Sequence, residues 1–251
     1  MRHLFRSWRE VAFRLRHAPK IALFLDFDGT LARLRPRPQE VILESSLRQA
    51  LAMLARSPRF FVWIISGRRQ SDIRDRIGVN GIRYLGLHGW EGRRAAPLEE
   101  SASLALAGVK SWAGGLFAGA HDVWIEDKGF SFAVHHQGTT PPGPPVKQVL
   151  EGMVEPFKDV LRVAPSKNVH EVLPLELEDK GAAVKHQMAA ICSRAIPIYV
   201  GDDTIDEPAF AALRRGITVR VGRAHRSKAR YRLSDIVEVR RFLQRLGSEF
   251  A

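Results

Sequence analysis

Residues 21–30 read IALFLDFDGT, an apolar run that leads into two aspartates one residue apart. An apolar run of this length, bounded by Asp-Gly, predicts a β-strand buried on both faces, with Asp26 and Asp28 emerging together at its carboxyl end. Open α/β sheets bind their ligands at that edge. Crowded carboxylates stay ionised only if a cation lies between them, and oxygen ligands suit Mg²⁺. The stretch therefore predicts an α/β fold with a magnesium site, the alternative being an ordinary turn with solvated acids.

A second predicted strand, residues 60–65 with the sequence FFVWII, ends in Ser66, Gly67 and Arg68. These three residues supply a small hydroxyl donor, a flexible joint and a cation. A phosphoryl group needs donors of this kind, because its oxygens carry the negative charge. The end of this strand is therefore a candidate phosphoryl site.

Lys180 and Gly181 mark the predicted start of a helix, where the chain passes from an acidic into a helical stretch between residues 175 and 191. The amino terminus of a helix attracts anions through its unpaired N–H groups and its dipole. The ammonium group of Lys180 and the helix terminus could therefore face one anion. The alternative is a solvated surface charge.

A third apolar strand, residues 196–200, is followed by four acidic side chains within six residues: Asp202, Asp203, Asp206 and Glu207. Acids are common at helix amino termini because they favour the helix dipole, and Asp206 and Glu207 fit that interpretation. Asp202 and Asp203 stand directly at the strand end, so they fit a metal site better.

In this order, the four segments resemble the motifs of the haloacid dehalogenase superfamily of phosphotransferases. The resemblance implies that Asp26 is the nucleophile that becomes a phosphoaspartate. It implies that Asp28 is the general acid toward the leaving oxygen and then the base for water. Ser66 and Lys180 would hold the phosphoryl oxygens.

The same resemblance implies Mg²⁺ as the cofactor. The ligands would be Asp26, Asp202 and the backbone carbonyl of Asp28. Asp203 or Asp206 would act as a further ligand or hold the ligands in place, and the sequence leaves the choice between them open.

Further segments narrow the resemblance to trehalose-6-phosphate phosphatases. They are residues 86–91 (GLHGWE), 126–131 (EDKGFS) and 171–174 (EVLP), with His135 and the carboxyl-terminal part from residue 218. The resemblance implies hydrolysis of trehalose 6-phosphate in trehalose biosynthesis. Acids, lysines and amides supply the donors and acceptors that sugar hydroxyls need. The candidate substrate-binding residues are Gly67, Arg68, His88, Glu126, Lys128, Ser131 and Glu171.

Some positions differ from the usual pattern of that family. Ile205 stands where threonine is usual, Leu173 where arginine is usual, and His136-Gln137 where Tyr-Arg is usual. A site that loses a hydrogen-bonding partner can lose discrimination between substrates. A phosphatase for another sugar phosphate, such as sucrose phosphate, a glycosyl-glycerate phosphate or a hexose phosphate, is therefore an alternative. A non-catalytic basic binding protein on the same scaffold is a third hypothesis.

The pattern of predicted elements changes inside the chain. From residue 21 to 91 strands alternate with helices, which predicts a parallel sheet covered by helices. Between residues 94 and 177 the predicted order is helix, two strands, helix, two strands, with a proline-rich breaker at 141–145. We expect residues 1–93 and 178–251 to form a Rossmann-like core. The insert would be an αββαββ (C2-type) cap that sets substrate specificity and closes over the sugar.

The net charge of +12 is concentrated toward the two ends of the chain. Leu4, Trp8, Val11 and Leu15 repeat at helical spacing, so residues 1–20 predict a basic amphipathic helix. Packing on the core is its simplest role, and the alternatives are attraction to an anionic membrane or an address signal. The charge can steer an anionic sugar phosphate, so it does not require nucleic acid as a partner.

Composition disfavours several other classes of protein. No stretch approaches the roughly 20 apolar residues of a membrane span. The single cysteine, Cys192, excludes an internal disulfide and is expected to pack as a small hydrophobe. The histidines lack the spacing of a zinc site, and the glycine-rich loops of nucleotide and dinucleotide enzymes are absent. We expect a monomeric protein of the cytoplasm.

Overall fold

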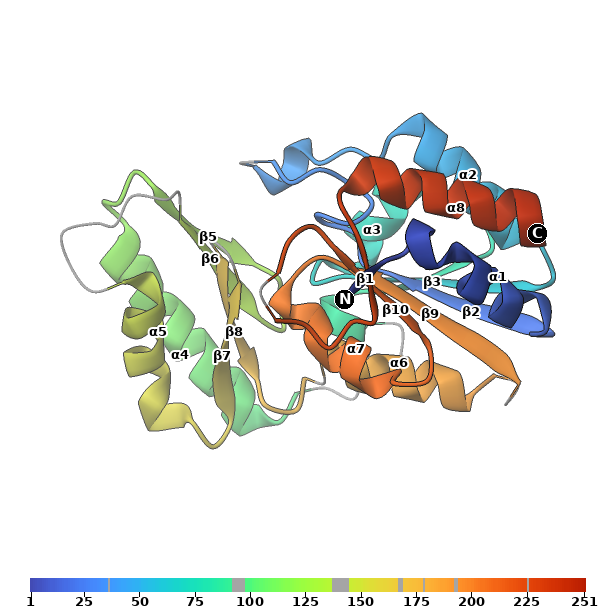
Figure 1. Ribbon diagram of the computed structural model, residues 1–251. Helices are drawn as coiled ribbons and strands as arrows, with labels where there is room; N and C mark the ends of the chain where they lie inside the picture. Colours follow the sequence, from blue (N-terminus) through green and yellow to red (C-terminus); the bar gives the residue numbers. More distant parts are fainter. Residues whose placement is uncertain are drawn as a thin grey trace. The chain divides into compact units, whose positions relative to one another are not determined.

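The computed structural model describes residues 1–35, 37–91, 98–136, 145–166, 169–177, 179–191, 194–224 and 226–251 (Figure 1). Cys192, Gln137 and the proline-rich breaker up to residue 144 lie outside the described residues. The chain divides into two compact units, Met1–Arg93 with Glu178–Ala251 and Arg94–Leu177. We call them the core unit and the inserted unit.

The core unit is built on one parallel sheet. Its strands are β1 (Arg2–His3), β2 (Lys20–Leu25), β3 (Phe60–Ile65), β4 (Ile82–Leu85), β9 (Ala195–Gly201), β10 (Ile217–Val221) and β11 (Tyr231–Leu233). Over the described residues, they form a seven-stranded sheet in the order β1-β11-β10-β9-β2-β3-β4, in which neighbouring strands are parallel. β2 therefore lies inside the sheet, between β9 and β3. The predicted fold class, a Rossmann-like core with an α+β insert, is confirmed.

Helices cover both faces of this sheet (Figure 1). They are α1 (Trp8–Arg16), α2 (Ser45–Arg56), α3 (Gln70–Ile77), α6 (Lys180–Ala189), α7 (Glu207–Ala212) and α8 (Ile236–Phe250). Ile21, Leu23 and Leu25 of β2 belong to the apolar cluster under α1, α2 and α8, whereas Ala22 and Phe24 belong to the cluster under α6 and α7. Alternate side chains of a strand point to opposite faces, so β2 is buried on both, as predicted. Polar side chains can then reach a ligand only at the strand ends.

The first residues of the chain pack onto the core unit. The sequence pattern predicted the helix α1 but not the short edge strand β1 that precedes it. Leu4, Trp8, Val11 and Leu15 are all buried. The indole N–H of Trp8 donates to Glu249 of α8 at 3.2 Å. The apolar face of the amphipathic helix is thus used for packing on the core unit, the simplest of the roles expected for it.

The inserted unit has an antiparallel sheet with two helices. Its elements are α4 (Glu100–Phe117), β5 (Val123–Asp127), β6 (Phe132–His136), α5 (Val146–Val154), η4 (Glu155–Phe157), β7 (Leu161–Ser166) and β8 (Val169–Pro174). The strand order is β5-β6-β8-β7. β6 begins only at Phe132, because a turn precedes it: Gly129 has a φ of +82°, and the Lys128 N–H donates to the Ser131 carbonyl at 2.9 Å.

One face of this second sheet is apolar. Phe132 and Val134 of β6 and Val172 of β8 pack with residues of α4 and α5 in a single cluster. The alternation of side chains then places polar residues of the same strands on the other face. Within the described ranges, no helix combines the length and apolar character needed to cross a membrane.

Candidate active site

Three strand ends meet at the carboxyl edge of the core sheet. Asp26 follows β2 directly, and its backbone N–H donates to the carbonyl of Val200 in β9 at 2.9 Å. Asp202 follows β9, on one side of β2, and Ser66 follows β3, on the other side. The parallel arrangement therefore brings residues that are distant in sequence to one edge, where ligands of open α/β sheets bind.

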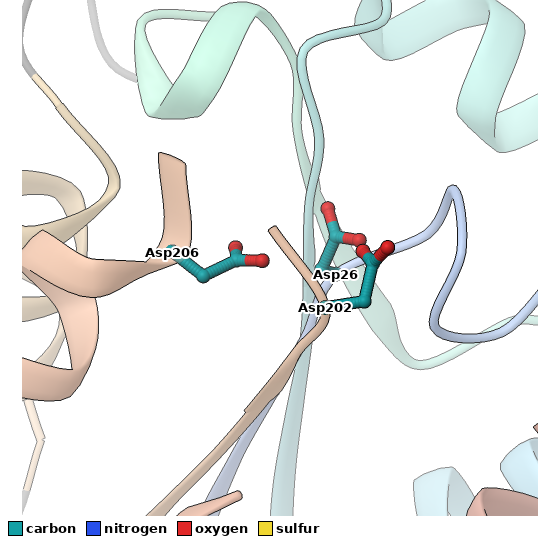
Figure 2. A group of neighbouring side chains, drawn as sticks. All are labelled: Asp26, Asp202 and Asp206. Carbon is teal, nitrogen blue, oxygen red and sulfur yellow. The ribbon is translucent and has the colours of Figure 1, made fainter. Parts of the chain in front are cut away.

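Asp26, Asp202 and Asp206 form a cluster of carboxylates (Figure 2). Each offers one oxygen, and these oxygens lie within 4.8 Å of one another. Asp26 and Asp206 are buried, with 4% and 0% of their surface exposed. Three buried or partly buried acids carry more negative charge than one lysine can balance. An all-oxygen set of this kind fits a hard divalent cation such as Mg²⁺.

Lys180 lies between two of these acids. Its Nζ donates to Oδ1 of Asp26 at 2.6 Å and to Oδ1 of Asp206 at 2.7 Å. The hydroxyl of Tyr199 donates to the same oxygen of Asp206 at 2.8 Å. Burial alone would lower the pKa of Lys180, but the charges of Asp206 and Asp26 outweigh it and raise that pKa. The ammonium group therefore stays charged although it is fully buried.

Asp202 and Asp206 use their carboxylates differently. Both oxygens of Asp206 accept hydrogen bonds, Oδ1 from the two donors just named and Oδ2 from the N–H of Asp203 at 3.0 Å. Within the described residues, Asp202 accepts only one, from the Thr30 hydroxyl at 3.4 Å. Asp202 therefore keeps lone pairs for a cation, whereas Asp206 holds Lys180 in place.

Asp203 lies next to Asp202 but does not join the cluster. Its Oδ1 accepts hydrogen bonds from the N–H of Thr204 at 2.6 Å and from the Thr204 hydroxyl at 3.2 Å. It thereby caps the short 3-10 helix η5 (Thr204–Asp206). Of the two acids between which the sequence left the choice open, the structure brings Asp206 into the carboxylate cluster.

Burial shifts the pKa values of the two acids at the strand ends. It raises the pKa of Asp26 to about 7, with Lys180 opposing the shift and Asp206 adding to it. Burial, followed by repulsion from Asp26, raises the pKa of Asp202 to about 9. The metal-free site therefore retains protons that a divalent cation would replace, which agrees with the oxygen ligand set.

We expect the metal-free protein to lose stability as the pH rises from roughly 4 to roughly 9. The folded-state pKa values of Asp26 and Asp202 lie above the unfolded value of 3.8. The folded state therefore binds protons more tightly over this range, and the free energy of unfolding falls with rising pH. Urea unfolding in a chelator, at several pH values between 6 and 9, measures the effect.

Asp202→Asn is the comparison for this pH dependence, because it removes the group with the higher pKa and should flatten the curve. Added Mg²⁺ should stabilise the unmodified protein most at high pH, since the apparent affinity rises up to about tenfold per pH unit for each proton displaced. If the unfolding free energy depended on pH equally in both proteins, this would contradict the raised pKa of Asp202.

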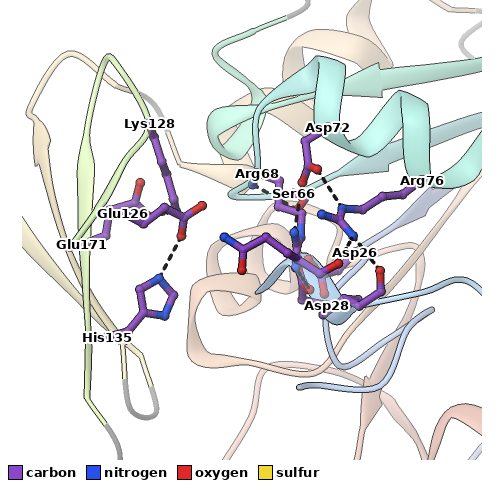
Figure 3. Close-up of polar contacts among 12 residues, drawn as sticks. Asp26, Asp28, Ser66, Arg68, Asp72, Arg76, Glu126, Lys128, His135 and Glu171 are labelled. Atoms are coloured by element: carbon purple, nitrogen blue, oxygen red, sulfur yellow. Dashed lines mark hydrogen bonds and ion pairs between the residues drawn. The ribbon is translucent and has the colours of Figure 1, made fainter. Parts of the chain in front are cut away.

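Arg68 is paired with Asp28 (Figure 3). Its Nε and Nη2 donate to the two carboxylate oxygens of Asp28 at 2.6 and 2.8 Å, and its Nη1 donates to Asp72 at 3.0 Å. Arg76 donates to Asp72 at 2.8 Å and to the carbonyl of Val41 at 2.7 Å. The residue predicted as a phosphate donor is thus held by two carboxylates, and it fixes the orientation of Asp28.

The predicted acid–base role of Asp28 implies that Asp72→Asn lowers kcat by about 10- to 100-fold, because a loosened Arg68 would no longer hold the Asp28 carboxylate in place. The matched control is Asp75→Asn, an exposed acid on the same helix, which should leave kcat unchanged. Phosphate release at saturating substrate measures both variants. Equal rates would mean that the ion pair of Asp72 has no part in positioning Asp28.

The predicted segment 86–91 lies against the end of β3. His88 and Leu87 have φ values of +60° and +46°, which non-glycine residues uncommonly adopt and which cluster at functional sites. A Cβ on Gly67 would overlap the ring of His88, so the two residues are in contact range. The Glu91 carboxylate accepts from the N–H of Gln70 at 2.5 Å and so satisfies one of the unpaired N–H groups at the start of α3.

The polar face of the inserted unit carries the remaining candidate residues. Ser131 Oγ donates to Oε1 of Glu171 at 2.6 Å, and Lys128 Nζ lies 3.2 Å from its Oε2. His135 Nε2 lies 2.8 Å from Oε2 of Glu126, as Figure 3 shows. Lys128, Ser131 and Glu171 are buried. The predicted sugar contacts therefore form two groups of paired side chains, on the second sheet and in the turn between β5 and β6.

The residues that sequence reasoning missed are those that hold other side chains in place: Tyr199, Thr30, Asp72 and Arg76. The spacing of Asp72 and Arg76 is the i,i+4 spacing of helical ion pairs, so a signal was present for them. Tyr199 lies in an apolar strand and Thr30 in a turn. Nothing in the sequence around these two indicates their carboxylate partners.

Known proteins resemble this chain over most of its length. A model of the trehalose-phosphatase family matches residues 24–236. A Mycobacterium tuberculosis protein described as an uncharacterized glycosyl hydrolase is 31% identical over 94% of this chain and 19% of its own length. Probable trehalose-phosphate phosphatase 4 of Oryza sativa subsp. japonica is 27% identical over 96% of this chain and 69% of its own length.

A solved structure agrees with these matches at the level of the fold. The C-terminal domain of the C. albicans trehalose-6-phosphate phosphatase has a TM-score of 0.80 at 20% identity, covering 98% of both chains. The present chain spans about a fifth of the length of the mycobacterial relative. Because the family match covers most of its residues, the chain belongs to the trehalose-phosphatase family.

Proposed function

We propose that the protein is a Mg²⁺-dependent phosphatase that hydrolyses trehalose 6-phosphate to trehalose and phosphate. The observation that carries the proposal is the complete set of reacting groups around Asp26 in a member of this family. Lys180 donates to Oδ1 of Asp26, and in the described part of the chain no hydrogen bond reaches Oδ2. One oxygen of a buried carboxylate is therefore available to a substrate.

In the first step, the Asp26 carboxylate attacks phosphorus and forms a phosphoaspartate, while the bond from phosphorus to the sugar oxygen breaks. Asp28 donates its proton to that oxygen, so trehalose leaves as a neutral alcohol. Lys180 keeps Asp26 oriented and supplies a positive charge beside the phosphoryl oxygens. Ser66 lies buried at the end of β3 and is the proposed hydroxyl donor to the same group.

In the second step, Asp28 is a carboxylate and takes a proton from water. The water oxygen attacks phosphorus, the bond to Asp26 breaks, and phosphate leaves. The bidentate contact with Arg68 holds the Asp28 carboxylate in place for this step. The proton taken from water returns Asp28 to the protonated form that the next first step needs.

The residues that would hold Mg²⁺ are Asp26, Asp202 and the backbone carbonyl of Asp28. Asp206 supports them through Lys180, because both of its oxygens already accept hydrogen bonds. Asp203 supports them as a helix cap. When bound, the cation would neutralise charge on the transferring phosphoryl group.

The inserted unit is the proposed cap that recognises the sugar. Glu171 and Glu126 offer carboxylate oxygens, while Lys128 and Ser131 offer donors, and sugar hydroxyls require both. His88, beside Gly67, is the proposed contact from the core unit. A cytoplasmic monomer is part of the same proposal.

A phosphatase for a different sugar phosphate is the second candidate. Leu173 stands two residues from Glu171 and is buried, so this position offers no charged donor to a sugar. His136 contacts His170 and therefore lies on the other face of the sheet from Glu171. Fewer donors on the polar face favour a smaller or differently shaped sugar.

Phosphate release with Mg²⁺ over a panel of substrates tests the proposal. The panel holds trehalose 6-phosphate, sucrose 6-phosphate, glucosyl-glycerate phosphate and glucose 6-phosphate, with Asp26→Asn as the blank. Strong preference for trehalose 6-phosphate is the expected result. Preference for another sugar would favour the second candidate, and no release from any of them would overturn both and favour a binding protein.

A further inference from the structure

Two histidines of the inserted unit lie together although they come from different strands. His136 ends β6 and His170 lies in β8, and their Nε2 atoms are 3.2 Å apart. Each stands two residues from a valine, Val134 or Val172, of the apolar cluster under α4 and α5. The histidine pair therefore lies on the helix-covered face of the sheet, opposite the polar face with the candidate sugar contacts.

We propose that His136 and His170 form a binding site for a transition-metal cation such as Zn²⁺, separate from the carboxylate cluster of the core unit.

The separation of the two rings supports a shared cation. Two imidazole nitrogens bound to one tetrahedral Zn²⁺ lie about 3.3 Å apart, which places the ring centroids about 5.2 Å apart. The observed values are 3.2 Å between the Nε2 atoms and 5.1 Å between the centroids. Both separations are therefore compatible with two imidazoles bound to one cation.

The surroundings of the pair favour the neutral rings that bind metals. Burial, followed by repulsion from His135, lowers the pKa of His136. Burial, followed by repulsion from His136 and Lys147, lowers the pKa of His170, and the charge of Glu151 opposes this shift in part. Neutral imidazole suits Zn²⁺, Ni²⁺ and Cu²⁺, whereas Mg²⁺ prefers oxygen ligands. The two sites should therefore select different cations.

His170 is the better buried of the two and has an unused polar atom. It is 8% exposed, and its Nδ1 is buried without a hydrogen-bond partner in the described structure. Glu151 of α5 pairs with Lys147 at 3.4 Å and is the acidic group whose charge acts on His170. Among the described residues only the carboxylate cluster of the core unit brings three ligand side chains together, so here the two histidines would be the protein ligands and water would fill the other positions. A bound cation would link β6 directly to β8.

Thermal unfolding with added Zn²⁺, in an excess of Mg²⁺ that occupies the carboxylate cluster, tests the proposal. The variants are His136→Gln and the matched control His121→Gln, which removes an exposed histidine of the same unit. Zn²⁺ should raise the Tm of the unmodified protein and of the control alike. The affinity of His136→Gln for Zn²⁺ should be weaker by about tenfold or more. Cu²⁺ added to the unmodified protein should give an electron paramagnetic resonance spectrum with two nitrogen ligands.

Equal Zn²⁺ affinity in His136→Gln and the unmodified protein would overturn the proposal and leave only a hydrogen-bonded pair. If His136→Gln does not fold, the site can be tested by nuclear magnetic resonance of the imidazole nitrogens in the unmodified protein. Zn²⁺ should shift the Nε2 resonances of both histidines, and the absence of those shifts would equally overturn the site. These measurements do not involve turnover, so they are independent of the proposed phosphatase activity.

Discussion

Phosphate release is expected to fall by about 10⁴-fold or more when Asp26 is replaced by asparagine, because an amide cannot serve as the nucleophile. The variant should stay folded, since the side chain keeps its size. Burial already raises the pKa of Asp26 to about 7, so a neutral group at this position costs little. An assay of phosphate release, together with a Tm measurement, tests both parts of the expectation.

Asp203→Asn is the matched control for this loss of activity. Like Asp26→Asn, it replaces one carboxylate oxygen by an amide nitrogen. Because asparagine also caps helices, the variant should keep η5 in place. We expect this variant to lose far less activity than Asp26→Asn. A folded Asp26→Asn protein that still turns over substrate would contradict the role of Asp26 as nucleophile.

The largest loss of stability is expected from Lys180→Met. The lysine is fully buried, and its removal would leave Asp26 and Asp206 as buried acids without their cation. Breaking a buried ion pair in this way typically costs about 3–5 kcal/mol of unfolding free energy. Activity should fall as well, because the phosphoryl oxygens would lose a positive partner. Urea unfolding at neutral pH in a chelator measures the stability.

Two further variants separate this effect from a general loss of helix packing. Lys185→Met lies on the exposed side of α6 and should change the unfolding free energy by less than about 0.5 kcal/mol. Asp206→Asn added to Lys180→Met should restore part of the lost stability, because it removes one of the two stranded charges. Similar unfolding free energies of Lys180→Met and Lys185→Met would show that the ion pairs of Lys180 with Asp26 and Asp206 do not stabilise the fold.

The sequence was most informative where a side chain follows a buried strand directly. Asp26 and Asp202 could be expected to meet, because both stand at the end of an apolar run and parallel strands share one edge. The position of Asp206 was harder to predict. It depends on a single 3-10 turn, which turns Asp203 into a cap and points Asp206 back toward Lys180.

Pairings between distant segments could not be predicted from local patterns. Alternation along a strand implies that the neighbours His135 and His136 point to opposite faces, but it does not reveal that β8 lies beside β6 and brings His170 next to His136. In the same way, the residue type of Arg68 indicated an anion partner. Only the folded chain identifies that partner as Asp28, because the two residues come from different strand ends.

The pairing of β1 with β11 has a consequence for the order in which the chain folds. The N–H groups of Arg2 and Leu4 donate to the carbonyls of Arg230 and Arg232 at 3.1 and 3.0 Å, so the first strand finds its neighbour near the end of the chain. The inserted unit, Arg94–Leu177, is complete before those residues are synthesised. It can therefore fold while the core sheet still lacks β10 and β11, and we expect the closure of this long loop to come late in folding.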